Sequence, residues 1–361
     1  MSAPAALPLT YVLPLKAEAP DAELAGYLRA LCRVVDVVVV DASPPAVAAA
    51  QRRLWPAAVR VCGVDADLVC ANGKVAGVLT GLRRARHTAA VVADDDVRHD
   101  PSTLSRLLVL LDDADVVVPA NHFHPLCWHA RWDTARTLLN RALGHDYPGT
   151  LGLRRSALAA TGGYDGDVLF ENRELIETVR AAGGVVRSAP DLHVRRLPPT
   201  TRRFLEQRVR QAYDSLAQPG RLAAELALLP AAVLAARRGP RALVGLAAAA
   251  VTVAEVGRRR DGGAAVFPAT AALWAPLWLV ERGLCSWLAL VARLRGGVRY
   301  GGSRLARAAT PRRELARRHG GALSAASSRR GAASAQQAAA ASAQQVEAGQ
   351  DREGEHELLE A

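Results

Sequence analysis

Short apolar runs alternate with amphipathic stretches along the first part of the chain. The runs at 9–15, 34–40 and 88–93 are rich in valine, leucine and alanine, which is typical of strands buried on both faces of a sheet. The stretches at 21–31 and 72–82 instead place apolar residues at helical spacing. This β-α-β alternation predicts a doubly wound, parallel α/β sheet.

The same pattern predicts further elements up to residue 218. We expect strands at 58–61, 115–119 and 150–154. We expect helices at 101–111, 171–183 and about 201–216, and a further helical segment that ends at Leu143. Residues 161–166 have the composition of a turn.

Acidic residues follow two of the predicted strands. Asp41 follows the second strand, and the acidic tip (Asp94, Asp95 and Asp96) follows the strand at 88–93. Ligands of open α/β sheets bind outside the carboxyl ends of the strands. Residues at i and i+2 project to the same side, so Asp94 and Asp96 can hold one Mg²⁺ ion with a substrate phosphate. The alternative is a solvated acidic turn before the helix that Asp100 and Pro101 begin.

The composition changes after Gly220. Apolar stretches at 222–236, 242–256 and 264–292 are flanked by arginines, and the first two are shorter than a straight membrane crossing needs. We expect helices in or at a membrane interface, in monotopic or re-entrant form, with a soluble Ala/Leu helical bundle as the alternative. The expected division is a catalytic domain at 1–218, a membrane-associated helical region at 219–305, and a disordered Ala/Gln/Ser-rich tail with an acidic end at 306–361.

Composition narrows the classes of partner. The net charge is +11, which suits a phosphorylated substrate or an anionic membrane. Only 4% of residues are aromatic and no nucleic-acid-binding motif is present, so we expect no nucleic-acid partner. Five scattered cysteines fit a reducing compartment, and the N-terminal residues lack the pattern of a signal peptide.

Three histidines are close together in the sequence. His122, His124 and His129 do not have the spacing of a usual zinc site, and a wall of an acceptor pocket or plain surface fits them better.

Several short motifs, taken in order, resemble the family 2 GT-A glycosyltransferases, including their membrane-bound ceramide and hopanoid glucosyltransferase-like branch. The resemblance covers about residues 9 to 305. Its carriers are Val40-Asp41-Ala42-Ser43, Asn72-x-Lys74, Asp94-x-Asp96, Gly162-Gly163-Tyr164-Asp165, Phe170-Glu171-Asn172, Gln207-Arg208-Val209-Arg210-Gln211 and Gly296-Gly297-Val298-Arg299-Tyr300-Gly301.

The resemblance implies a GT-A-type doubly wound mixed sheet followed by C-terminal apolar, membrane-associated helices. It implies an inverting transfer of sugar from a UDP- or GDP-sugar to a lipid or lipid-linked acceptor, at the cell membrane with the catalytic domain facing the cytoplasm. Mg²⁺ or Mn²⁺ would bind Asp94 and Asp96, acting as a Lewis acid on the diphosphate. The implied donor-binding residues are Asp41, Lys74, Asp94, Asp95, Gln207 and Arg210.

Two positions depart from the family pattern. Asn172 occupies the place of the aspartate that commonly serves as general base, and Gln211 occupies that of a tryptophan. Glu171 and Glu174 are the remaining candidates for the base. The missing aspartate supports an alternative, a catalytically inactive protein that binds nucleotide-sugar or lipid. A soluble nucleotidyltransferase is a third hypothesis, but it would not need the apolar region.

Overall fold

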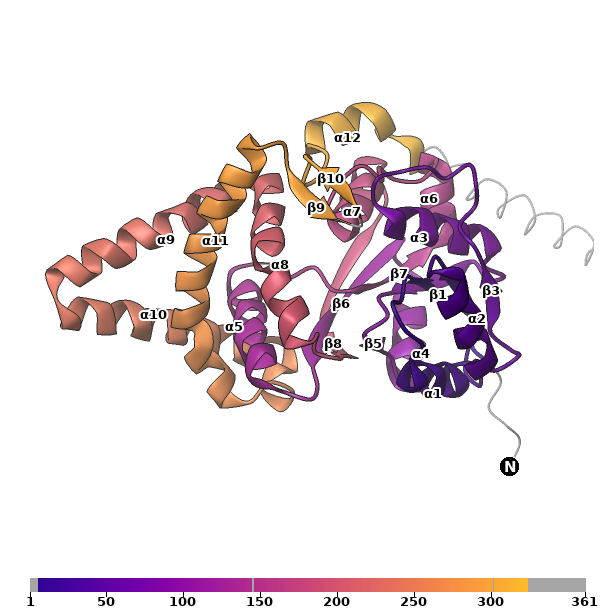
Figure 1. The fold of residues 1–361 in the computed structure, drawn as a ribbon, viewed down its shortest axis with the longest axis horizontal. Helices are drawn as coiled ribbons and strands as arrows, with labels where there is room; N and C mark the ends of the chain where they lie inside the picture. The colour runs from indigo at the N-terminus through magenta and orange to yellow at the C-terminus, as the bar shows by residue number, and fades with distance from the viewer. Residues whose placement is uncertain (1–5, 145, 301, 324–361) are drawn as a thin grey trace, which may run out of the picture.

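A mixed β-sheet forms the centre of the N-terminal sheet domain (Figure 1). The computed structural model describes residues 6–144, 146–300 and 302–323. Within them, the eight strands of the main sheet are β1 (Leu9–Leu15), β2 (Asp36–Asp41), β3 (Arg60–Cys62), β4 (Ala89–Ala93), β5 (Val97–Arg98), β6 (Val116–Phe123), β7 (Thr150–Arg154) and β8 (Val186–Arg196).

The strand order is β3-β2-β1-β4-β7-β6-β8-β5. Strands β3, β2, β1 and β4 are parallel, as the β-α-β alternation predicts. Strand β7 runs antiparallel to both β4 and β6, and β8 is parallel to β6. The sheet is therefore mixed, which confirms the fold class expected from the resemblance. The continuous parallel part of the sheet consists of the four strands β3, β2, β1 and β4 from the N-terminal part of the chain.

Helices cover both faces of the sheet. The helices of the sheet domain are α1 (Ala22–Leu31), α2 (Pro45–Leu54), α3 (Gly73–Arg84), α4 (Pro101–Leu110), α5 (Trp128–Leu143), α6 (Arg155–Thr161), α7 (Glu171–Ala181) and α8 (Thr201–Tyr213). Tyr11 of β1 is buried on one face with leucines of α1 and α4. Its neighbour Val12 is buried on the other face with residues of α3, α6 and α7. This alternation follows from the period of two along a strand.

Capping side chains set where the helices of the site begin. Asp21 and Asn72 are the N-caps of α1 and α3, and their side chains accept hydrogen bonds from backbone N–H groups of the first turn. Asp100 forms a capping box with Thr103 at the start of α4. Asp100 and Pro101 thus begin a helix, and the acids before them remain at the end of β4.

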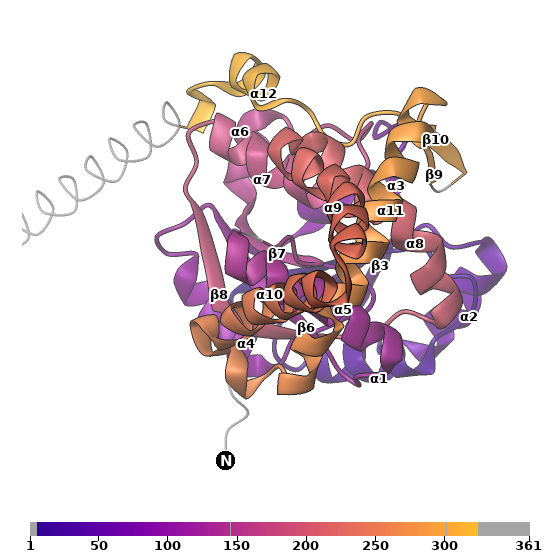
Figure 2. The same cartoon turned by 90° about the vertical axis from the view of Figure 1, so that its left-hand side faces the viewer.

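Three apolar helices follow the sheet domain: α9 (Pro219–Arg238), α10 (Pro240–Arg259) and α11 (Ala275–Leu294). The short helical turns η1 (Asp214–Ala217), η2 (Arg260–Ala265) and η3 (Ala269–Trp274) connect them to each other and to α8. Helices α9 and α10 form a hairpin whose tip projects away from the sheet, while the C-terminal part of α10 packs on α5 and α11 lies against α8 and α5 (Figures 1 and 2). The predicted C-terminal apolar helices are thereby confirmed.

Helices α9 and α10 are longer than the apolar stretches at 222–236 and 242–256, whereas α11 is shorter than the stretch at 264–292. The segments Pro219–Arg238, Pro240–Ala265 and Ala269–Leu294 are long and apolar enough to cross a membrane, judged by length and composition. Their exposed side chains include Val244 and Val233, which are 68% and 53% exposed. Exposed apolar surface on this scale favours contact with lipid.

The residues after α11 return to the sheet domain. This return segment (302–323) follows β9 (Val298–Tyr300) and contains β10 (Ser303–Leu305) and α12 (Arg312–His319). Leu315 and Leu323 are each 1% exposed, and the Arg312 guanidinium binds the Glu177 carboxylate of α7 at 2.7 Å. The expected disordered tail at 306–361 therefore needs correction, because residues 306–323 pack on the catalytic domain. The rest of that tail, 324–361, lies outside the described residues.

Candidate active site

The acidic tip is held by the backbone of two neighbouring strands. The Asp94 N–H donates to the Gly149 carbonyl at 2.8 Å, just before β7, and the Leu197 N–H donates to the Asp96 carbonyl at 2.8 Å, just after β8. A Cβ atom at position 149 would lie 2.5 Å from Asp94 Oδ2, so a larger residue there would displace the Asp94 carboxylate. The tip is thus positioned by strands that are distant in the sequence.

Arg196 joins the two carboxylates of the predicted metal pair. Its Nε lies 3.0 and 2.9 Å from the two carboxylate oxygens of Asp96, and its Nη2 lies 3.2 Å from Asp94 Oδ2. Because one guanidinium contacts both carboxylates, Asp94 and Asp96 face a common partner, although residues 94–96 form a turn in which the Val97 N–H donates to the Asp94 carbonyl at 3.1 Å, and not the extended strand tip from which this was expected.

A second cation, Lys74, links the tip to α7. Its Nζ lies 2.5 Å from Asp94 Oδ1 and 2.6 Å from Glu171 Oε1. Asn72 caps α3 just before Lys74, and its Nδ2 donates to the Val168 carbonyl at 3.1 Å, which ties α3 to the loop before α7. Three residues singled out in the sequence, Lys74, Asp94 and Glu171, therefore meet in space.

Burial and charge oppose each other in this cluster. Burial alone would raise the pKa of Asp94, but the Lys74 ammonium and the Arg196 guanidinium outweigh it and hold that pKa below its usual value. Burial raises the pKa of Asp96, and the nearby Asp94 carboxylate adds to this rise against the effect of Arg196. Lys74 and Arg196 therefore outweigh the effect of burial at Asp94, whereas at Asp96 the effect of Arg196 does not.

The donor atoms at the tip fit a hard divalent cation. Asp94 and Asp96 offer carboxylate oxygens on one side, and Mg²⁺ typically takes one or two carboxylates and completes its shell with water and phosphate. Arg196 already places a cationic group against both carboxylates, which shows that positive charge is stabilised at this position. No cluster of three or more His, Cys, Asp or Glu side chains suited to a metal occurs in the part of the chain that the structure describes.

Asp41 lies on the same edge of the sheet but not in the cluster. It ends β2, which is separated from β4 by β1. Its Oδ1 accepts a hydrogen bond from the Ser43 N–H at 2.9 Å, while its buried Oδ2 has no hydrogen-bond partner among the described residues. A buried carboxylate oxygen without a partner is costly and is suited to a donor group on a ligand.

The arginine motif of α8 faces the site through Tyr300. The Arg210 guanidinium lies 5.1 Å from the centre of the Tyr300 ring, which is a cation–π distance. Burial and the Glu171 carboxylate raise the pKa of Tyr300 to about 12, so this ring lies near the cluster. Gln207 is half-buried one turn earlier in α8. Asp95 lies between the paired acids, and its carbonyl accepts a hydrogen bond from Arg98 at 2.7 Å.

The two candidate bases have different surroundings. Glu171 is bound to Lys74, whereas Glu174 is fully buried and its Oε2 accepts a hydrogen bond from the Thr310 N–H at 2.7 Å. Glu174 therefore contacts the return segment instead of the acidic tip. Asn172 donates from Nδ2 to the Pro148 carbonyl at 2.9 Å and so supports the loop that contains Gly149.

Sequence patterns did not single out several residues that face the site. Arg196 was missed because β8 was not predicted, although the Arg195-Arg196 pair at a strand end was a usable signal. Arg203 helps to lower the pKa of Asp94, after the larger effects of burial and of Lys74 and Arg196. Of the three histidines, His122 lines a small cavity with Arg136 and Arg196, and His129 contacts the Pro199 carbonyl at 2.7 Å.

Three solved structures are among those that are similar to this chain. The chain is similar to the mannosyltransferase PcManGT from Pyrobaculum calidifontis in complex with GDP-Man and Mn²⁺, with 19% identity, 81% of this chain and 88% of that chain covered, and a TM-score of 0.49. The chain is also similar to S. aureus TarS in complex with UDP-GlcNAc, with 14% identity, 55% of this chain and 60% of that chain covered, and a TM-score of 0.37. The third is mannosyl-3-phosphoglycerate synthase from Rubrobacter xylanophilus, with 16% identity, 55% of this chain and 69% of that chain covered, and a TM-score of 0.39.

A family model matches the part of the chain that contains the cluster. A search of curated protein sequences finds no match to this chain. Residues 38–123, which include Asp41, Lys74 and the acidic tip, match the model of glycosyl transferase family 21. This match confirms the predicted enzyme class, a glycosyltransferase.

Proposed function

We propose that this glycosyltransferase moves a sugar from a nucleotide-sugar to a lipid or lipid-linked acceptor, with inversion at the anomeric carbon and with Mg²⁺ or Mn²⁺ as cofactor. The observation that carries this proposal is the convergence of Lys74, Arg196 and the acidic tip at the carboxyl edge of the sheet. A nucleoside diphosphate and a divalent cation need this combination of basic and acidic groups.

Each residue of the site has a place in the proposed reaction. The unpartnered oxygen of Asp41 would accept a hydrogen bond from the nucleoside, two strands away from the tip. Lys74 and Arg210 would bind phosphate oxygens of the donor, since both are cations near the tip. Asp94 and Asp96 would hold the metal ion, which when bound neutralises charge on the diphosphate leaving group.

The apolar helices support a lipid acceptor. Helix α11 packs on α5 and α8, so the exposed apolar surface is continuous with the elements that carry Arg210. An acceptor held in a membrane beside α9, α10 and α11 would meet the sheet domain at this junction. All five cysteines are free thiols, which supports a catalytic domain facing the cytoplasm.

Donor and acceptor screening in detergent tests this function. Purified full-length protein would be incubated with UDP- and GDP-sugars, with and without Mn²⁺, and with a membrane lipid extract. We expect a glycosylated lipid to form only when Mn²⁺ or Mg²⁺ is present. Sugar transfer that is unaffected by chelation of divalent cations would contradict the metal assignment, and no transfer with any lipid would contradict the acceptor class.

One observation favours a second candidate, a protein that binds donor or lipid without turnover. Asn172 has no ionisable group, and the neighbouring Glu171 is engaged by Lys74. In that case the same screen would detect donor binding but no transferred sugar with any acceptor.

A further inference from the structure

The contacts around α7 leave the proton of an acceptor hydroxyl without an obvious recipient. Glu171 is paired with Lys74, and Asn172 carries an amide. Glu174 binds the Thr310 backbone through Oε2, and its Oε1 has no partner but is buried against the return segment side of α7 and not exposed to an acceptor. A base on the acceptor side must be a carboxylate or imidazole with an available lone pair close to the donor site. The acids where the sheet domain meets the apolar helices are therefore the place to search.

Asp214 lies at this junction. It is the first residue of η1, directly after α8, and α9 begins five residues later. Its neighbours Tyr213 and Ser215 are buried, and Tyr213 packs with residues of α11 and the return segment. Figure 1 shows this end of α8 close to β9, β10 and α11. Asp214 thus connects the helix that carries Arg210 with the helices that face lipid.

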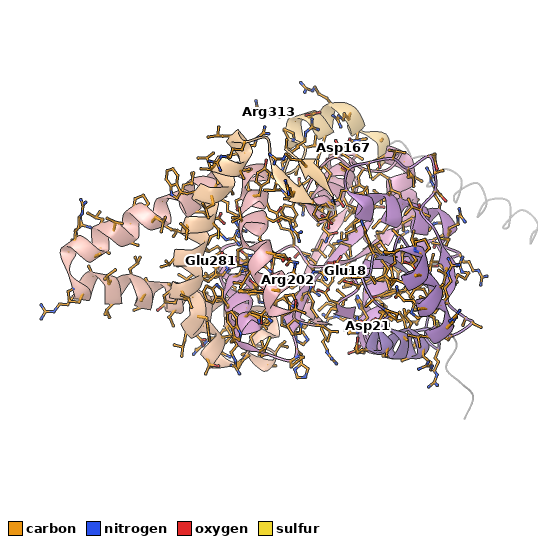
Figure 3. The ribbon with its side chains drawn as sticks, in the orientation of Figure 1. Glu18, Asp21, Asp167, Arg202, Glu281 and Arg313 are labelled. Atoms are coloured by element: carbon orange, nitrogen blue, oxygen red, sulfur yellow. The ribbon has the colours of Figure 1, made fainter. Side chains whose placement is uncertain are left out.

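The Asp214 carboxylate differs from the other acids of the junction in having no partner. Asp133 binds Arg208 at 2.7 Å, and Glu225 binds Arg221 at 2.9 Å. Glu281, drawn on α11 beside α8 in Figure 3, contacts Arg208 at 3.5 Å. The half-buried Asp214 carboxylate makes neither a hydrogen bond nor an ion pair to any residue that the structure describes.

Packing places Asp214 near the donor site, because its neighbour Tyr213 belongs to one buried cluster with Leu169, two positions before Glu171, and Tyr300 packs against that cluster. Burial raises the pKa of Asp214 to about 7, and the Glu171 carboxylate adds to this rise. The groups that oppose the rise are the guanidinium groups of Arg210, Arg282 and Arg221. A carboxyl group with this pKa changes its protonation state near neutral pH, which is the range in which a general base works best.

We propose that Asp214 is the general base that accepts the proton of the acceptor hydroxyl, and that the acceptor is a neutral lipid alcohol entering beside α9 and α11. This inference rests on the proposed transferase function. The acceptor O–H bond breaks and its proton goes to an oxygen of Asp214. The acceptor oxygen forms a bond to the anomeric carbon, while the bond from that carbon to the diphosphate breaks and the nucleoside diphosphate leaves with the electron pair.

The test compares Asp214→Asn with a matched control, Glu206→Gln, which removes an exposed acid of α8. Donor binding, thermal unfolding and sugar transfer to lipid extract are measured for the full-length protein in detergent. We expect Asp214→Asn to bind donor normally and to lose about 10²–10⁴-fold in transfer. Glu206→Gln should match the wild type in all three measurements.

A pH profile separates a base from a structural residue. For the wild type, kcat/KM should rise with pH through about 7, because Asp214 accepts a proton only when it is ionised. Asp214→Glu should keep part of the rate with a displaced pH profile, whereas Asp214→Asn should lose the rise. If Asp214→Asn transfers sugar as fast as the wild type, the assignment is overturned. If the wild type transfers sugar only to phosphorylated lipids, the assignment is also overturned, because a phosphate oxygen needs no base. If the wild type transfers to no lipid at all, the proposed function itself is overturned.

Discussion

Lys74 and Glu171 are 97 positions apart in the chain, and their side chains meet at 2.6 Å beside the acidic tip. The same ammonium also lies 2.5 Å from Asp94, so it compensates two carboxylates at once. Burial opposes the charge on Lys74, but Asp94 and Glu171 together hold its pKa well above the usual value. The N-terminal ends of α3 and α7 are therefore joined through a single cation.

Replacing Lys74 by methionine should weaken donor binding. A charge-assisted hydrogen bond to phosphate contributes about 1.5–3 kcal/mol, so the loss in affinity should be about 10–100-fold. The measurement is calorimetric titration with UDP or GDP in the presence of Mn²⁺. Arg83→Met is the matched control, because Arg83 belongs to the same helix but pairs with Asp65 and Asp67 at the surface. Equal affinities for the wild type and Lys74→Met would remove Lys74 from the donor site.

Arg196 should compete with a divalent cation for the acidic tip. It contacts both Asp94 and Asp96, so Arg196→Gln leaves these carboxylates with less positive charge. We expect a lower Tm without metal, and a larger rise in Tm on adding Mn²⁺ than in the wild type, because ligand binding stabilises the folded state. Arg195→Gln provides the control at the adjacent position. A smaller Mn²⁺-induced rise in Arg196→Gln than in the wild type would show that Arg196 supports the metal site instead.

His99 should make stability depend on pH. It is buried between the Thr103 and Thr150 hydroxyls, and burial lowers its pKa to about 3. The unfolded chain binds a proton at this histidine below pH about 6.5, whereas the folded chain stays neutral there until about pH 3. The stability that His99 contributes is therefore complete above pH 6.5 and is lost as the pH falls toward 3. Between pH 7 and pH 5 the loss is about 2 kcal/mol.

The check is to compare denaturant unfolding of the wild type and His99→Gln at these two pH values. The variant should be less stable at pH 7 and should lose less stability on acidification. Equal pH dependence in the two proteins would contradict the neutral, buried state of His99.

The predicted elements depend on how regular the local pattern is. Strands β1 and β7 begin and end where the sequence predicts, and all but one residue of each is buried. Strand β8 was missed because its sequence, VRSAPDLHVRR, mixes arginines, a proline and an aspartate with few apolar positions. Its pairing with β6 along the sheet is a tertiary effect that local pattern does not reveal.

Asp94 and Asp96 share one partner, as expected, but the period of a strand does not explain it. The acids were expected on one side of an extended strand tip, whereas residues 94–96 form a turn after β4. The identity of the partner was not predictable, since Arg196 is one of 46 Lys and Arg residues and belongs to the unpredicted strand. Likewise, the positions of Glu174 and Asp214 depend on how α7, α8 and the return segment pack together.

The apolar helices should bind membranes through exposed side chains of the α9–α10 hairpin. A lysine at position 244, in place of a valine that is 68% exposed, would cost about 2.5–3.5 kcal/mol at the centre of a bilayer. We expect Val244→Lys to shift the full-length protein from vesicles to the supernatant in a sedimentation assay. Val109→Lys is the control, because Val109 is 64% exposed on α4 of the sheet domain. If both variants sediment like the wild type, the hairpin is not the membrane contact. Point substitution is preferable to cutting the chain after residue 218, because α11 and the return segment pack on the sheet domain.

The central claim is that the acidic tip binds the donor together with a divalent cation. Titration of UDP and GDP into wild type, Asp96→Asn and the surface control Asp67→Asn, each with and without Mn²⁺, tests this most directly. We predict that Mn²⁺ strengthens nucleotide binding to the wild type and to Asp67→Asn but has no effect on Asp96→Asn, while all three proteins have the same circular dichroism spectrum. An undiminished Mn²⁺ effect in Asp96→Asn would contradict the claim.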